Sequence, residues 1–185
     1  MKFLFNRKIA GLIAVIIVVV ATVGGVNGSV SRLAGDVERL FYDGMYHQSD
    51  GYLQPSINSQ IEKQADAALG LATLLQRFPG LKDASDALLS ARLELLDSRG
   101  ISDKCRDRLV MDRAFAALAE AARLSVEISE REIDAVEQHW NAYQGASTFI
   151  EVTLAPAYND KVDEFYNQRS FLAALINSTA PEHYR

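Results

Sequence analysis

Apolar residues recur three and four positions apart along most of this chain, the spacing of one face of an α-helix. The first such stripe runs from Val30 to Phe41 and stops at Asp43-Gly44. Residues 45 to 54 contain two turn-prone patches and no apolar period. The pattern therefore predicts a first helix that ends before Gly44, followed by a loop as far as Gln54.

Four further stripes predict the body of the fold. They run from Ile57 to Leu75, Leu81 to Leu95, Met111 to Val126 and Ile133 to Tyr143. We expect helices from Pro55 to residue 77, from Leu81 to just before Gly100, and from Ser102 as a cap onward. Ser129 and Glu132 form a capping-box pair, which predicts a helix start at about residue 130.

Pro156 interrupts the next stretch of helical pattern, and we expect a kink or short break there because proline lacks a backbone donor. Helical periodicity resumes at Tyr158 and fades by Asn177. Each apolar stripe needs another to cover it, and the connections are short. The sequence thus predicts an all-α fold: an antiparallel up-and-down bundle of four to five helices over residues 29–178, with a tail of residues 179–185.

The N-terminal region predicts a membrane anchor. Lys2, Arg7 and Lys8 precede 18 residues without a charge, Ile9 to Val26. As a helix these would span about 27 Å, close to the thickness of a bilayer core. The basic residues place residues 1–8 in the cytoplasm and the rest outside it, in a single-pass protein of the cell membrane.

A cleaved signal peptide is the alternative, since a basic start, an apolar run and small residues at Gly24, Gly25 and Gly28 also suit a signal peptidase. The run is longer than the usual apolar region, and no Ala-x-Ala follows it. We therefore expect a retained anchor.

Charge and composition exclude several kinds of function. Three of the 19 Lys and Arg precede residue 9, so the remaining 16 face all 24 Asp and Glu, a net charge of −8. Nucleic acid is therefore not an expected partner. The single cysteine, Cys105, excludes an intramolecular disulfide. His47, His139 and His183 are far apart, and no catalytic, phosphate-binding or metal-binding motif is present, so we expect no enzyme activity, no cofactor and no metal.

One stretch near the C-terminus carries the candidate site residues. Tyr158, Val162 and Phe165 lie on one helix stripe, and Asn159 and Tyr166 form the adjacent one. We expect a helix seam in which the aromatic rings are core and Asn159 makes one interhelical hydrogen bond. A ligand pocket lined by Tyr158, Asn159 and Tyr166 is the alternative.

These features together resemble the LemA family. The chain has a short basic N-terminus, one apolar segment, long helices and a C-terminal element from Tyr158 to Phe165, followed by Phe171 to Leu175. It departs from the family where Tyr166 and Asn167 follow Phe165, since the family repeats an aromatic-Asn pair there. The resemblance implies a divergent member: a membrane-anchored antiparallel helical bundle without recognised catalytic residues.

The expected function is that of a non-enzymatic envelope protein, which acts by contact with another protein or with itself. The alternative is an extracytoplasmic bundle that binds or senses a small ligand near Trp140, Tyr143, Tyr158 and Tyr166. We favour the first, because eight residues before the apolar run leave no room for a sensor's cytoplasmic output domain.

We predict that cell fractionation will recover the whole chain with the membranes, because Ile9 to Val26 favours insertion by several kcal/mol. Sequencing the N-terminus of the recovered protein is the measurement. A soluble product that begins near Val26 to Val30 would instead establish the cleaved signal peptide.

Overall fold

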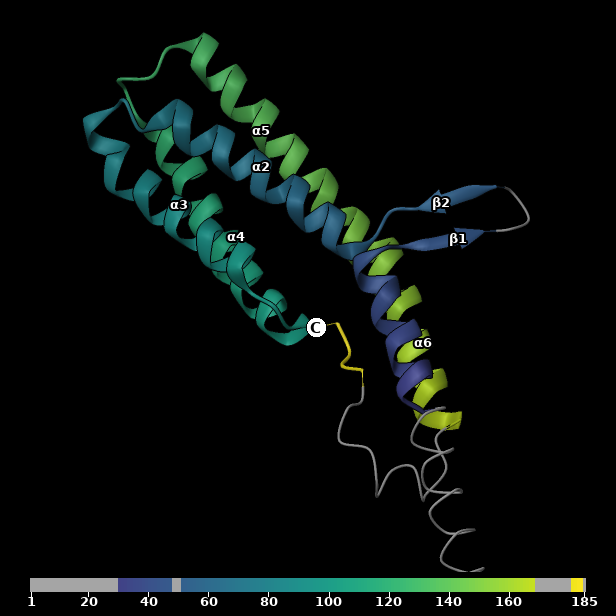
Figure 1. Ribbon diagram of the computed structural model, residues 1–185. Helices are drawn as coiled ribbons and strands as arrows, with labels where there is room; N and C mark the ends of the chain where they lie inside the picture. Colours follow the sequence, from purple (N-terminus) through teal and green to yellow (C-terminus); the bar gives the residue numbers. More distant parts are fainter. Residues whose placement is uncertain (1–29, 48–50, 169–180, 185) are drawn as a thin grey trace, which may run out of the picture. The chain divides into compact units, whose positions relative to one another are not determined.

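The computed structural model describes residues 30–47, 51–168 and 181–184, which are mostly helical (Figure 1). The chain divides into two compact units. The larger unit comprises Arg39–Asp160 and Glu182–Arg185, and the smaller unit comprises Met1–Glu38 and Lys161–Pro181. Within the described ranges no helix is long and apolar enough to cross a membrane. The predicted anchor, residues 9–26, lies outside those ranges.

A helical bundle forms the larger unit. Its helices are α2 (Ile57–Leu75), α3 (Lys82–Asp97), α4 (Ile101–Leu124) and α5 (Glu130–Phe149), with a short 3-10 turn at Pro79–Leu81. Figure 1 shows α2 running alongside α5, while α3 and α4 lie against each other. Helix α2 also packs on α3, so it is the central helix of this group.

Small residues at the centre of the bundle allow its helices to approach closely. Ala68, Ala72, Ala119 and Ala122 are fully buried. Around them lie larger apolar side chains that are also inaccessible to solvent; these are Ile57, Ile61, Leu71, Leu75, Leu88, Leu95, Met111, Phe115, Leu118 and Ile150. The predicted stripes supply most of the core, although Leu33 and Leu69 are each 39% exposed and Val126 is fully exposed. Val126 lies beyond the end of α4, where no helix covers it.

The predicted loop between Asp43 and Gln54 is wrong, because this segment contains a β-hairpin. Strands β1 (Met45–His47) and β2 (Tyr52–Gln54) pair antiparallel, with Met45 opposite Gln54. Three residues per strand are too few for a recognisable alternation of polar and apolar positions. Gly44 adopts φ +84°, and a Cβ there would lie 2.2 Å from the Gln54 carbonyl oxygen, so only glycine suits this turn.

Helix starts follow the capping residues, with two corrections to the prediction. The Ser129–Glu132 capping box is confirmed at the start of α5. Helix α2 begins at Ile57 rather than Pro55, because the Ser56 hydroxyl accepts the Ser59 N–H at 3.0 Å and caps the helix. Helix α4 begins at Ile101, one residue before the predicted Ser102 cap, with Gly100 in extended conformation as its N-cap.

A kink or short break was expected at Pro156; the helix does not break there, but it departs from α geometry just before the proline. The chain remains helical from α5 through a π-helical segment, Ile150–Leu154, into α6 (Ala155–Gln168). In the π segment the Ala155 N–H donates to the Ile150 carbonyl, five residues back. This wider turn lies directly before Pro156, where an ordinary helix would bring the proline ring against the carbonyl four residues earlier.

Helices α2 and α5 pack closely at Gly70, against the ring of His139. A Cβ on Gly70 would lie 2.3 Å from Cε1 of His139. We predict that Gly70→Ala displaces the His139 ring and lowers the free energy of unfolding by about 1–3 kcal/mol. Urea unfolding of the full chain in detergent is the measurement.

Gly145 provides the matched control, because it lies in α5 with no heavy atom within 4 Å of an added Cβ. Gly145→Ala should stabilise by about 0.5–1 kcal/mol. Adding His139→Ala to Gly70→Ala should recover part of the loss. Equal stability of Gly70→Ala and Gly145→Ala would disprove the close packing.

Candidate functional site

A buried arginine organises the polar groups of the larger unit. Arg108 lies on α4 and is 4% exposed. Its guanidinium donates four hydrogen bonds; the acceptors are Gln64 Oε1 at 2.9 Å, Tyr184 Oη at 2.6 Å, Ser147 Oγ at 2.7 Å and Glu151 Oε1 at 3.1 Å. Three helical elements and the C-terminal segment therefore meet at one side chain.

Two carboxylates balance the charge of Arg108. Glu151, in the π segment, forms the closer ion pair at 3.1 Å, and Asp112 lies one helical turn along α4 at 3.9 Å. Burial alone would lower the pKa of Arg108, but its interactions with Tyr184, Asp112 and Glu151 outweigh burial and raise that pKa. Arg108 is therefore a permanent cation inside the bundle.

Asp112 is held in turn by Tyr143 of α5. The Tyr143 hydroxyl donates a short hydrogen bond to Asp112 Oδ1, and the Tyr143 ring stacks on Phe115 with centroids 3.9 Å apart. Burial, followed by the charge of Asp112, raises the pKa of Tyr143 far above its ordinary range. The hydroxyl stays protonated and fixes the orientation of the carboxylate that faces Arg108.

The occupant of the site is the C-terminal segment Glu182–Tyr184. Tyr158 Oη donates to the Glu182 carbonyl at 2.9 Å. Asn159 bonds both main-chain groups of Tyr184: its Nδ2 donates to the Tyr184 carbonyl at 3.0 Å, and its Oδ1 accepts the Tyr184 N–H at 2.8 Å. A pair of hydrogen bonds to the N–H and C=O of one residue also occurs between antiparallel strands. The Asn159 side chain of α6 therefore holds the main chain of the C-terminal segment.

The side chain of Tyr184 enters the bundle. It is 6% exposed, its ring centroid lies 6.2 Å from that of Phe41, and the Arg108 guanidinium lies 5.9 Å from the Tyr184 ring. Burial raises the pKa of Tyr184 to about 12, although the positive charge of Arg108 acts in the opposite direction. Tyr184 therefore binds as the neutral phenol and accepts from a cation.

One donor in this site is unused. Gln64 is fully buried, and its Oε1 accepts from Arg108, yet its Nε2 has no hydrogen-bond partner among the described residues. A buried amide donor without an acceptor costs free energy. The donors of the site thus exceed the acceptors that the C-terminal segment provides.

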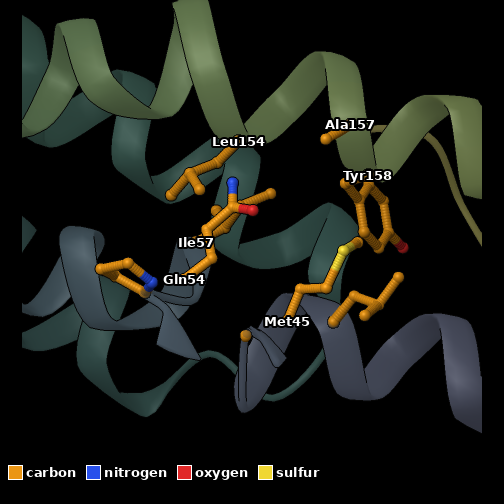
Figure 2. A pocket seen from close by; sticks show the side chains of 9 residues that line it. Met45, Gln54, Ile57, Leu154, Ala157 and Tyr158 are labelled. Atoms are coloured by element: carbon orange, nitrogen blue, oxygen red, sulfur yellow. The ribbon is translucent and has the colours of Figure 1, made fainter. Parts of the chain in front are cut away.

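A small apolar cavity of about 20 Å³, room for roughly one water molecule, is lined in part by Tyr158. Figure 2 shows Leu154 and Tyr158 on one side of it and Met45, Gln54 and Ile57 on the other. Among the described residues, no group of three or more His, Cys, Asp and Glu side chains could hold a metal ion.

All five predicted site residues lie on α6, where Tyr158, Val162 and Phe165 are buried, and the boundary between the two units falls between Asp160 and Lys161. Tyr158 and Asn159 hold the C-terminal segment, so the expected interhelical bond of Asn159 is wrong: its partner is the Tyr184 backbone. Val162 and Phe165 are buried in the smaller unit. Tyr166, also there, is 42% exposed and donates to the Pro181 carbonyl at 3.2 Å.

Sequence reasoning missed Arg108, Gln64 and Tyr184. A signal existed for Arg108, because it lies three residues before Met111 and seven before Phe115, on the apolar stripe of its helix. A charge on such a stripe indicates a buried partner. Tyr184 had no comparable signal, since it lies in a segment without helical period that was predicted to be a tail.

Comparison with known proteins gives no matching family model, no matching curated protein and no matching solved structure.

The pKa of Tyr184 predicts an alkaline loss of stability. In the unfolded chain a tyrosine ionises near pH 10, whereas in the fold the pKa of Tyr184 is about 12. The unfolded state loses its proton first, so this stabilisation is complete below about pH 10 and is lost as the pH rises towards 12. We expect the free energy of unfolding to fall by about 3 kcal/mol over that range from this group.

Urea unfolding followed by the fluorescence of Trp140, the single tryptophan, measures this dependence. Tyr184→Phe should flatten the alkaline slope and also destabilise at neutral pH, because Arg108 loses an acceptor. Tyr52→Phe is the control, since Tyr52 is 54% exposed. An unchanged slope in Tyr184→Phe would show that Tyr184 is not buried against Arg108.

Proposed function

We propose that this chain is a membrane-anchored helical-bundle protein of the LemA type that acts by protein-protein contact and performs no chemistry. In this proposal residues 9–26 cross the cell membrane once, residues 1–8 are cytoplasmic, and the bundle lies outside the cytoplasm as an antiparallel up-and-down arrangement. The order of features along the chain and the element from Tyr158 to Phe165 support the LemA assignment.

A single observation supports protein contact most strongly: the site holds an extended protein segment. Asn159 bonds both main-chain groups of Tyr184, as an added β-strand would. The buried Arg108 guanidinium donates a hydrogen bond to the Tyr184 hydroxyl oxygen. Backbone pairing for affinity combined with a side-chain pocket for specificity is a general mode of peptide recognition. Two residues of the LemA-like element, Tyr158 and Asn159, provide this backbone pairing.

The chemistry of the site also favours binding over catalysis. Tyr143 holds its proton because of burial and the charge of Asp112. Arg108 directs its donors at groups of the protein itself. These groups are arranged to hold a segment in place, and their protonation states are fixed over the neutral pH range.

Binding of a small ligand is the second candidate, favoured by Gln64 Nε2, which has no hydrogen-bond partner among the described residues. The residues predicted for that pocket lie apart in the fold, however. Trp140 and Tyr143 flank Phe115 in an aromatic stack, and Tyr158 lies against Phe41 at 6.0 Å between ring centroids. A ligand here would therefore have to enter at Gln64 and Arg108 rather than among the predicted aromatic residues.

Site-specific crosslinking in intact cells tests the proposed function. A photo-crosslinking amino acid replaces Glu182, an exposed residue of the bound segment, in the full chain. We expect discrete products that mass spectrometry identifies as one reproducible protein partner, because the segment lies at the contact site.

The matched control carries the same crosslinker at Leu124, which is 76% exposed at the end of α4. Asn159→Ala should also reduce the products from position 182, since it removes two hydrogen bonds to Tyr184. Identical products from positions 182 and 124 would argue against contact at this site.

A further inference from the structure

The bound segment is a short arm rather than part of a helix or strand. Residues 182–184 are held by four hydrogen bonds from side chains of α4 and α6, made by Arg108, Tyr158 and Asn159. Of the described residues, 161–168 and Pro181 group with the smaller unit, whereas residues 182–184 group with the larger. The C-terminal segment thus packs on the larger unit, while the described residues before it belong to the smaller one. Proteins commonly exchange such segments between copies, which is called domain swapping.

The three side chains define the ligand that the site accepts. Tyr158 donates a hydrogen bond to a main-chain carbonyl. Asn159 bonds the N–H and C=O of the residue two positions later, and Arg108 donates to the phenol oxygen of that residue. The ligand class is therefore a peptide in which a tyrosine follows, two residues later, a carbonyl group that can accept a hydrogen bond. Every copy of this chain carries such a segment in Glu182–Tyr184.

We propose that the site also binds residues 182–184 of a second copy, so that two copies exchange these segments. This inference rests on the proposed function of protein contact and names its partner. The exchanged state makes the same four hydrogen bonds as the closed monomer. The equilibrium between the exchanged dimer and the closed monomer therefore depends on two concentrations. Exchange is favoured when the local concentration of other copies exceeds the effective concentration of each copy's own segment at its site.

Confinement to a membrane would favour exchange, because copies anchored in one plane meet at high local concentration. The exchange is reciprocal: each copy provides one segment and accepts one, which closes a symmetric dimer and leaves no open end.

Two complementary variants of the full chain test the proposal by removing competition from each copy's own segment. The first variant ends at Pro181, so its site is intact and it has no segment to offer. The second carries Tyr158→Phe and Asn159→Ala, so its segment is intact and its site lacks three of the four hydrogen bonds. Phenylalanine at position 158 keeps the ring that packs on Phe41.

The two variants are purified in detergent with different affinity tags and mixed. We expect that capture of one variant through its tag will co-purify the other. The amount should be at least about tenfold above the self-association that each variant shows when two differently tagged forms of it are mixed. Only the mixture of the two variants contains both an empty site and an undocked segment. Adding Tyr184→Phe to the second variant should lower the recovery by about tenfold or more, because the hydrogen bond from a charged donor is lost.

Circular dichroism of each variant confirms that it is folded. If the double variant or the truncated variant is not helical, Asn159→Ala alone and Tyr184→Ala alone replace them. No recovery above the single-variant level from folded proteins would overturn exchange. The proposed function would survive that result if the crosslink from position 182 identifies a different protein, so the two failures are distinguishable.

Discussion

The larger unit is organised around one full positive charge that is shielded from solvent. A guanidinium with 4% exposure needs partners for its donors, and the fold supplies them from α2, the end of α5, the π segment and the C-terminal segment. Desolvation of an arginine costs several kcal/mol unless charge and hydrogen bonds compensate it. The positions of Glu151, Asp112 and Tyr184 relative to α4 follow from this requirement.

The π-helical segment makes the arrangement possible within one continuous helical run. Ser147 and Glu151, on either side of the start of this segment, both reach Arg108, and the Ser147 hydroxyl also bonds Glu151 at 3.0 Å. A π turn contains one more residue than an α turn, so it rotates every later residue about the helix axis. Tyr158 and Asn159 therefore point to the C-terminal segment from a helix whose earlier face is occupied by Arg108.

Most of the helical scaffold could be predicted from the sequence, because each helix of the larger unit buries a regular apolar stripe. Ile57, Leu88, Phe115 and Val136 all lie on predicted stripes and are buried. Local signals failed where the structure depends on distant contacts. The hairpin strands are too short for a period, and the helix continues past Pro156 because the preceding turn widens.

The candidate site was only half visible in the sequence for the same reason. Tyr158 and Asn159 could be selected, since an aromatic-amide pair on a helix is a local pattern. Their partner is 25 residues away from Asn159 and has no periodic context. A charge and a neutral amide on apolar stripes, Arg108 and Gln64, were the remaining signal, and such residues are easily taken for solvated positions when only the stripe is counted.

The proposed function would give Arg108 a role in recognition in addition to any effect on stability. Replacing a buried ion pair by well-packed apolar residues is often neutral or stabilising by about 1–4 kcal/mol, so a fold selected only for stability has little reason to keep one. An apolar side chain at position 108 could fill the same space but could not distinguish the phenol of Tyr184 from a phenylalanine ring. Arg108 gives the site a preference for tyrosine, while the Asn159 side chain can bond the N–H and C=O of any residue at that position. In the proposed function, that combination would let the site recognise the same segment each time it binds.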